Sequence, residues 1–111
     1  MSDAAILHAL GEPRRVAILR LVREREYPSG EIAARFPDVT GPAVSQHLRV
    51  LKQAGLIEER RSGTRRLYRA RAEGLAELRA LLRDFWDEGL GQLKDAAEQA
   101  QQRKGRRRGR Q

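Results

Sequence analysis

The sequence of 111 residues contains no cysteine and few aromatic residues. Without cysteine the chain forms no disulfide and offers no thiolate metal ligand and no cysteine nucleophile. No stretch approaches 18 consecutive apolar residues, and a basic start followed by a long apolar run is also missing. The sequence therefore supports neither a membrane-spanning helix nor a secretory leader, and we expect a cytoplasmic protein.

The spacings that are typical of enzyme active sites are also missing. The sequence shows no nucleophile beside a base, no paired carboxylates and no glycine-rich phosphate loop at suggestive spacing. We therefore expect no catalytic activity.

The sequence has only 15 acidic residues but 23 lysines and arginines, which gives a formal net charge of +8. Residues 103–111 hold six of the basic residues and no acid, so the first 102 residues carry 17 basic and 15 acidic residues, a net charge of +2. A second group without an interleaved acid comprises Arg60, Arg61, Arg65, Arg66, Arg69 and Arg71. Such a group is either a solvated surface or a contact for a polyanion.

Apolar periodicity predicts four helices in the first half of the chain. The first covers residues 3–10, and a Gly-Glu-Pro break separates it from a second helix that reaches about Arg25. A third, short helix is expected to be capped by Ser29. The fourth is expected to have Thr40 as its N-cap and to end at Gly55.

The second half of the chain changes pattern after Gly55. Two short strands joined by a turn at Ser62-Gly63-Thr64 fit best, and apolar residues then recur every three or four positions from about Ala72 to Gln102. We therefore predict a mainly α fold with a small β-hairpin, in the order α-α-α-α-β-β-α, over residues 1–102. Residues 103–111 are expected to form a disordered basic tail, either solvated or adding nonspecific DNA affinity.

The third and fourth predicted helices form the outline of a helix-turn-helix unit. With its apolar stripe turned to the core, the fourth helix presents Pro42, Ser45, Gln46 and Arg49 on its other face. Glutamine reads adenine and arginine reads guanine in the major groove, so Gln46 and Arg49 are our candidates for base reading. Ser45 and His47 flank this face and would contact either bases or phosphates. The alternative is an ordinary solvated face.

The tip of the predicted hairpin is expected to project beside the fourth helix. Its arginines suit phosphate or minor-groove contacts, which release condensed counterions and make the affinity depend steeply on salt. The complete set of predicted DNA-contacting residues is Thr40, Pro42, Ala43, Ser45, Gln46, His47, Arg49, Arg61, Thr64, Arg65 and Arg66.

Four segments together resemble the ArsR-type family of bacterial repressors. They are LGEPRR at 10–15, VSQHL at 44–48, LKQAGLI at 51–57 and RRLYR at 65–69. The resemblance covers about positions 4–95. It implies a dimeric winged helix-turn-helix protein that binds double-stranded operator DNA, with the first and last helices at the dimer interface.

Many members of this family sense metals through cysteine pairs or through Asp and His ligands on the last helix. This sequence has no cysteine, and its histidines are His8 and His47. The last predicted helix offers Asp84, Asp87 and Glu88 without a histidine beside them. We therefore expect no metal and no other cofactor, and leave open whether a small-molecule effector exists.

The last predicted helix is longer than a domain of this size needs to close its core. Its apolar residues would be exposed on a monomer, and such surfaces mark partner sites. A twofold dimer would place two recognition helices about 34 Å apart, which predicts a palindromic operator. The alternative is that the stripe packs within one subunit. The predicted dimer interface comprises Ile6, Leu7, Leu10, Leu78, Leu82, Phe85, Trp86, Leu90 and Leu93.

These observations predict a sequence-specific DNA-binding transcriptional regulator. We expect a homodimeric repressor that blocks polymerase at a palindromic operator, including one at its own promoter. The alternative is a winged-helix module that binds protein or double-stranded RNA without specific DNA binding, because a fold does not fix a function. An activating role also stays open.

Overall fold

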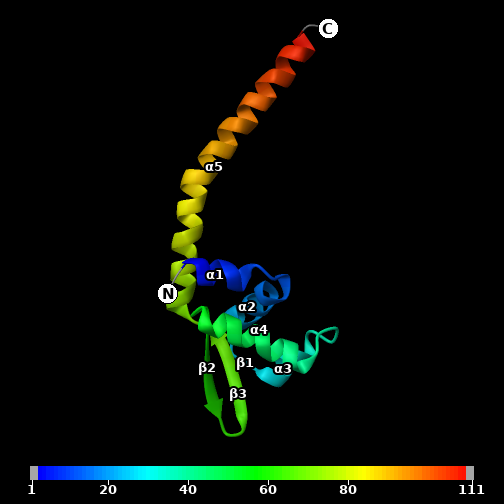
Figure 1. The fold of residues 1–111 in the computed structure, drawn as a ribbon, viewed down its shortest axis with the longest axis vertical. Helices are drawn as coiled ribbons and strands as arrows, with labels where there is room; N and C mark the ends of the chain where they lie inside the picture. The colour runs from blue at the N-terminus through cyan, green and yellow to red at the C-terminus, as the bar shows by residue number, and fades with distance from the viewer. Residues whose placement is uncertain (1–2, 110–111) are drawn as a thin grey trace. The chain divides into compact units, whose positions relative to one another are not determined.

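The computed structural model describes residues 3–109, apart from the side chains of residues 90, 93, 94 and 103–109. These residues form five helices and three strands (Figure 1). In chain order they are α1 (Asp3–Leu10), α2 (Pro13–Glu24), β1 (Tyr27–Pro28), α3 (Ser29–Ala34), α4 (Gly41–Gln53), β2 (Ile57–Ser62), β3 (Arg65–Ala70) and α5 (Ala72–Gly109). The predicted fold, mainly α with a small hairpin, is confirmed.

The structure divides into two compact units, residues 1–78 and 79–111. In the first unit α2 and α4 pack together, α1 contacts both of them, and α3 contacts α4. The side chains of Ile6, Ile18, Ile32 and Leu51 are almost completely buried between these helices. Their burial removes large apolar surfaces from water, which is the main force holding the unit together.

Side chains that cap helices decide where α2 and α4 begin. The Oε2 atom of Glu12 accepts hydrogen bonds from the backbone N–H groups of Arg14 and Arg15, at 2.7 and 3.1 Å. Thr40 caps α4 as predicted, since its Oγ1 accepts the N–H of Ala43 at 3.3 Å. The predicted cap at Ser29 is wrong: the proline before it occupies the N-cap position, and Ser29 is already the first helical residue.

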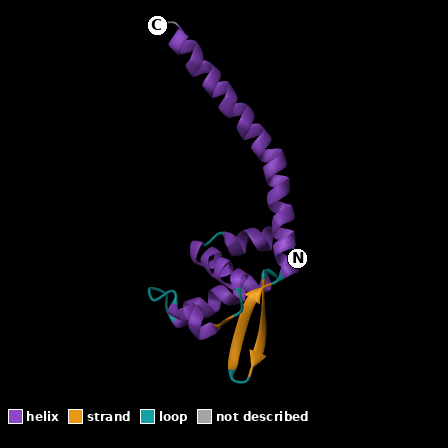
Figure 2. Cartoon of the chain, turned by 180° about the vertical axis from the view of Figure 1, so that it is seen from behind, coloured by secondary structure: helices purple, strands orange, loops and turns teal. Residues whose placement is uncertain are grey.

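The sheet has three antiparallel strands in the order β1-β3-β2, one more strand than predicted (Figure 2). In β1, Tyr27 pairs with Tyr68 and Pro28 pairs with Leu67. β1 is an edge strand, where a proline without an N–H group is tolerated. A two-residue strand is too short for its side-chain pattern to be visible in the sequence.

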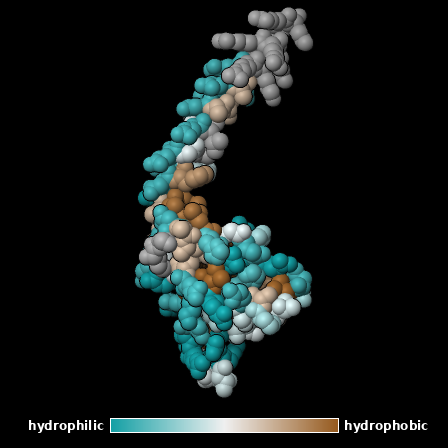
Figure 3. Space-filling view, viewed as in Figure 1, coloured by the Kyte–Doolittle hydropathy of each residue, from teal (hydrophilic) through white to brown (hydrophobic). Residues whose placement is uncertain are grey.

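The predicted hairpin is confirmed by strands β2 and β3, and we call residues 57–70 the wing. Ser62 pairs with Arg65, so the turn consists of Gly63 and Thr64. Gly63 has a φ of +64°, a left-handed conformation that glycine adopts without strain. Within the first unit the wing extends away from the helices, and its visible surface is mostly hydrophilic (Figures 1 and 3).

The first turn of α5 lies against the turn between α4 and β2. A Cβ atom added to Gly74 would overlap the carbonyl oxygen of Gly55, whose own φ is +75°. The backbone N–H of Arg71 donates to the carbonyl oxygen of Leu56 at 2.9 Å. Two glycines therefore allow a close backbone contact where the chain leaves α4 and where it enters α5.

The second unit consists of the rest of α5. We expected this helix to end near Gln102, but it continues to Gly109. Glutamine, arginine and lysine all favour helix, and one glycine at position 105 costs only about 1 kcal/mol. No helix in the portion of the chain that the structure describes is long and apolar enough to cross a membrane.

Candidate nucleic-acid interface

Helix α4 has one buried face and one exposed face. Val44, Leu48 and Leu51 are at most 3% exposed and fix the orientation of the helix on the core. The opposite face exposes most of the predicted DNA-contacting residues of this helix, and Ala43 beside them is half-buried. The exposed members are Thr40, Pro42, Ser45, Gln46 and Arg49.

The two candidates for base reading contact each other. The Nη1 atom of Arg49 donates a hydrogen bond to Oε1 of Gln46 at 3.0 Å. The residues are three positions apart, a spacing that puts side chains side by side on a helix. The structure therefore brings a planar guanidinium and an amide together on the exposed face.

His47 flanks the exposed face of α4 and is half-buried. Its side chain is 15% exposed, its Nε2 lies 3.9 Å from Oε2 of Glu12, and its Nδ1 lies 3.5 Å from Nη1 of Arg15. Position 47 follows Val44 by three residues, so it lies at the edge of the buried stripe. His47 therefore contacts the start of α2 from the edge of the exposed face.

Arg15 connects three helices, a role that its place in the LGEPRR segment does not indicate. Its Nε donates to the carbonyl oxygen of Ala9 at 2.6 Å, and its Nη2 donates to that of His8 at 3.1 Å. These bonds satisfy carbonyls at the end of α1, while the same guanidinium reaches His47 of α4. The Gly-Glu-Pro-Arg-Arg run marks this turn, but the partners of Arg15 come from segments that the run does not contain.

The wing has two faces, because side chains alternate along a strand and directly paired residues share a face. Glu59 pairs with Tyr68, and Arg61 pairs with Arg66. We call the face formed by these four residues the inner face, because Glu59 Oε2 lies 2.9 Å from Nζ of Lys52 on α4. A cleft of about 170 Å³ separates α4 from the inner face, and it is lined by Ser45, Leu48, Arg49, Lys52, Glu59, Arg66 and Tyr68.

The opposite face of the wing carries two arginines that are neutralised by carboxylates. Arg60 makes two hydrogen bonds to Glu26, at 2.7 and 2.8 Å, and these lower the pKa of Glu26. Arg69 donates to Oε1 of Glu58 at 2.6 Å. The arginine group that looked free of acids in the sequence is therefore partly compensated by acids from neighbouring segments.

Two arginines at the tip of the wing differ from these. Arg61 and Arg65 are exposed, and the described part of the chain shows no ion pair for either. Arg65 and Thr64, with Arg66, also line an open cavity beside the start of α3. The tip residues Arg61, Thr64 and Arg65 therefore lie where the sequence predicted them, exposed at the end of the hairpin.

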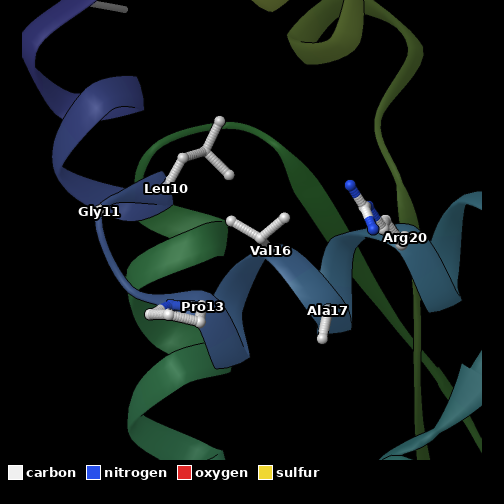
Figure 4. Close-up of a pocket in the computed structure, with 6 residues that line it drawn as sticks. All are labelled: Leu10, Gly11, Pro13, Val16, Ala17 and Arg20. Atoms are coloured by element: carbon white, nitrogen blue, oxygen red, sulfur yellow. The ribbon is translucent and has the colours of Figure 1, made fainter.

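The predicted dimer-interface residues fall into three groups. Ile6 is fully buried in the core of the first unit, so its assignment to an interface is wrong. Leu10 and Leu78 are half-buried, and Leu10 lines an open, mostly apolar groove with Val16 (Figure 4). The large exposed apolar residues are Leu7, Leu82, Phe85 and Trp86, with exposed fractions of 57%, 54%, 65% and 63%.

The apolar surface on α5 is visible in Figure 3. Leu90 and Leu93, also predicted for the interface, have side chains outside the described part of the structure. Among the side chains that are described, no group of three or more His, Asp or Glu residues is placed to hold a metal ion.

The sequence is similar to those of known bacterial regulatory proteins. Residues 12–59 match the model of the bacterial regulatory protein, arsR family. HTH-type transcriptional regulator Rv2034 of Mycobacterium tuberculosis is 45% identical over 82 residues, covering 74% of this chain and 76% of the relative.

Two solved structures are also similar. One is described as a possible transcriptional regulator for arsenical resistance; it has 42% identity and a TM-score of 0.70, over 78% of this chain and 90% of the other. The second is the homodimeric winged helix-turn-helix DNA-binding domain Mb0332 from Mycobacterium bovis, with 35% identity and a TM-score of 0.62, over 79% and 89% of the two chains.

Proposed function

The chain belongs to the ArsR family of bacterial regulatory proteins, and we propose that it represses transcription by binding a palindromic operator as a homodimer. Its fold is a winged helix-turn-helix. We infer that the described surface recognises DNA in two ways, by base reading from α4 and by phosphate contacts from the wing.

The observation that carries this proposal is the exposed pair of Gln46 and Arg49 next to a cationic hairpin. A major groove admits one α-helix, and Gln and Arg hydrogen-bond the edges of adenine and guanine. Arg61 and Arg65 at the tip of the wing supply charge for phosphates, which position the protein without reading sequence. Thr40 and Ser45, at the exposed start of α4, have hydroxyl groups suited to phosphate oxygens.

The dimer is supported by exposed apolar residues and by a relative. Leu82, Phe85 and Trp86 expose more than half of their surface, and large apolar patches usually mark partner sites. The relative Mb0332 is described as a homodimeric DNA-binding domain. A twofold dimer presents two copies of α4 to successive turns of the duplex, which requires two inverted half-sites about 34 Å apart.

Occupation of such a site at a promoter would exclude polymerase, and this is the form of repression that we propose, including at the chain's own promoter. We also propose that the protein acts in the cytoplasm without catalysis and without a cofactor.

In vitro selection of random duplexes with the purified chain, followed by footprinting, tests the proposal. We expect a motif with two inverted half-sites and protection of both. Selection that yields no motif would contradict specific DNA binding and favour the alternative of a protein-interaction module.

The oligomeric state is tested by sedimentation of the wild type and of Trp86→Glu. We expect a dimer for the wild type and a shift toward monomer for the variant, because a carboxylate would have to be desolvated in the interface. Gln92→Glu is the matched control, since it adds the same charge at another exposed position of α5. A monomeric wild type at the concentrations that bind DNA would overturn the dimer.

A further inference from the structure

We propose that Glu59 is a specificity-determining residue: by holding Lys52 of α4 and Arg66 of the wing, it keeps their charges from binding DNA phosphates in any register but one. The inference rests on the proposed function and adds to it a residue that favours the operator over other DNA without contacting a base.

Glu59 lies between the two elements that meet DNA. Its Oε2 is 2.9 Å from Nζ of Lys52, and its Oε1 is 3.6 Å from Nε of Arg66. The two oxygens of one carboxylate thus bind one cation from the recognition helix and one from the wing. Because the Glu59 side chain is only 16% exposed, its carboxylate is held in place while the two cations, each more than half exposed, face solvent.

The charges around this carboxylate have one sign. Lys52, Arg66 and Arg61 all lower the pKa of Glu59, with the hydrogen bond from Lys52 as the largest cause. Arg49 lines the same cleft. Among the described residues that line this cleft, Glu59 is the one acid, and the other charged residues are cations. Without it, the cleft between α4 and the wing would be an unopposed site for phosphate.

The position of this acid affects operator and nonspecific DNA differently. Nonspecific binding depends almost entirely on phosphate contacts, and it gains from long cationic side chains that can follow the backbone in many registers. Operator binding adds base contacts from α4, which fix one register. Cations that Glu59 holds in place can contact phosphates in the operator register but reach fewer phosphates in other registers. The preference for the operator therefore comes from weaker binding to nonspecific DNA.

The test compares the wild type with Glu59→Gln on two duplexes. One carries the motif selected in vitro with the wild-type chain, and the other is a shuffled duplex of the same length and composition. The dissociation constants are measured over a series of salt concentrations, and circular dichroism checks the fold of each variant. Glu58→Gln is the matched control, because it removes the same charge from the neighbouring position on the opposite face of the wing.

We expect Glu59→Gln to bind the shuffled duplex several-fold more tightly and to lose at least about threefold in the ratio of the two affinities. The salt dependence on the shuffled duplex should steepen by about one unit for each cation that gains a phosphate. Glu58→Gln should leave the ratio unchanged. Glu59→Asp, which keeps the charge at a shorter reach, should fall between wild type and Glu59→Gln.

Three results would overturn the inference. An unchanged affinity ratio in Glu59→Gln would show that the acid does not affect discrimination. If Glu59→Gln weakened binding to both duplexes by the same factor, Glu59 would only stabilise the position of the wing. If Glu58→Gln changed the affinity ratio as much as Glu59→Gln, the effect would come from net charge alone. If the wild type itself bound both duplexes equally, the proposed function would fail, which distinguishes that failure from the three above.

Discussion

On the exposed face of α4, Arg49 donates a hydrogen bond to Gln46, with 3.0 Å between Nη1 and Oε1. This bond uses one of the five N–H donors of the guanidinium and leaves the amide NH2 of Gln46 free to donate. Without DNA, the pair is therefore joined by a hydrogen bond on the helix surface. Contact with bases would replace one internal bond by several to the duplex.

Gln46→Ala and Arg49→Ala should each weaken binding to the selected operator by roughly tenfold to a hundredfold, which is the discrimination that one bidentate pairing with a base provides. Competitive gel-shift assays against the shuffled duplex would measure the effect. Because Gln46 is uncharged, its replacement should leave nonspecific affinity unchanged, while Arg49→Ala should lower that affinity as well. Gln53→Ala, an exposed neutral position at the end of the same helix, serves as the control, and an equal effect there would argue against base reading.

The tip of the wing should act on all DNA alike. Arg61→Ala and Arg65→Ala are expected to weaken operator and shuffled duplexes by similar factors and to reduce the salt slope by about one for each phosphate that is no longer neutralised. Arg69→Ala removes the same charge from a side chain that is bound to Glu58 at 2.6 Å. Its effect on the slope should be clearly smaller, and equal slopes for all three variants would contradict the role of the tip.

Gly74→Ala should destabilise the protein. The added Cβ would overlap the carbonyl oxygen of Gly55, and relieving such an overlap costs about 1–3 kcal/mol. Gly91→Ala on the same helix meets no atom within 4 Å and should stabilise by up to about 1 kcal/mol through helix propensity. Urea unfolding would show the opposite signs, and a neutral Gly74→Ala would mean that α5 shifts away without cost.

Acid should weaken the fold through its paired carboxylates. Arg60 lowers the pKa of Glu26 from its ordinary value of 4.5, and Arg14 lowers that of Asp38 from 3.8. A carboxyl whose pKa is lowered by folding stabilises the native state above its ordinary pKa, and this contribution is lost as the pH falls through the lower, folded value.

The unfolding free energy should therefore decrease below about pH 4.5, and Glu26→Gln should make this decrease shallower. Urea unfolding at a series of pH values would measure both curves. The control is Glu24→Gln, a nearby exposed acid for which the described residues show no ion pair. Parallel acid curves for wild type and Glu26→Gln would show that the bond to Arg60 has no influence on stability.

Local patterns predicted most of this fold. The cap at Thr40, the buried stripe of α4 and the turn at Gly63 each depend on residues close together in the chain, so they could be read from spacing. Ile6 was misassigned because the stripe of a short helix shows which residues are apolar and does not show which of them the same subunit covers.

Interactions between distant segments could not be predicted in the same way. Glu26 and Arg60 are 34 positions apart, and β1 forms by pairing Tyr27 with Tyr68 of β3, which lies in the second half of the chain. The wing arginines looked alike in the sequence, yet their partners differ, since the acids that neutralise Arg60 and Arg66 come from outside the acid-free run. The number of arginines in this segment of the sequence is therefore larger than the number that is free of ion pairs in the part of the chain that the structure describes.

The buried Tyr68 has an effect on the wing that its own chemistry does not suggest. It is only 7% exposed and is paired with Tyr27 on one side and Glu59 on the other. A slip of β3 by one residue would turn every side chain to the other face, and would pull this ring out of the core. The burial of the uncharged Tyr68 therefore fixes which side chains of β3 point to each face of the wing. It thereby determines which arginines of β3 lie beside α4.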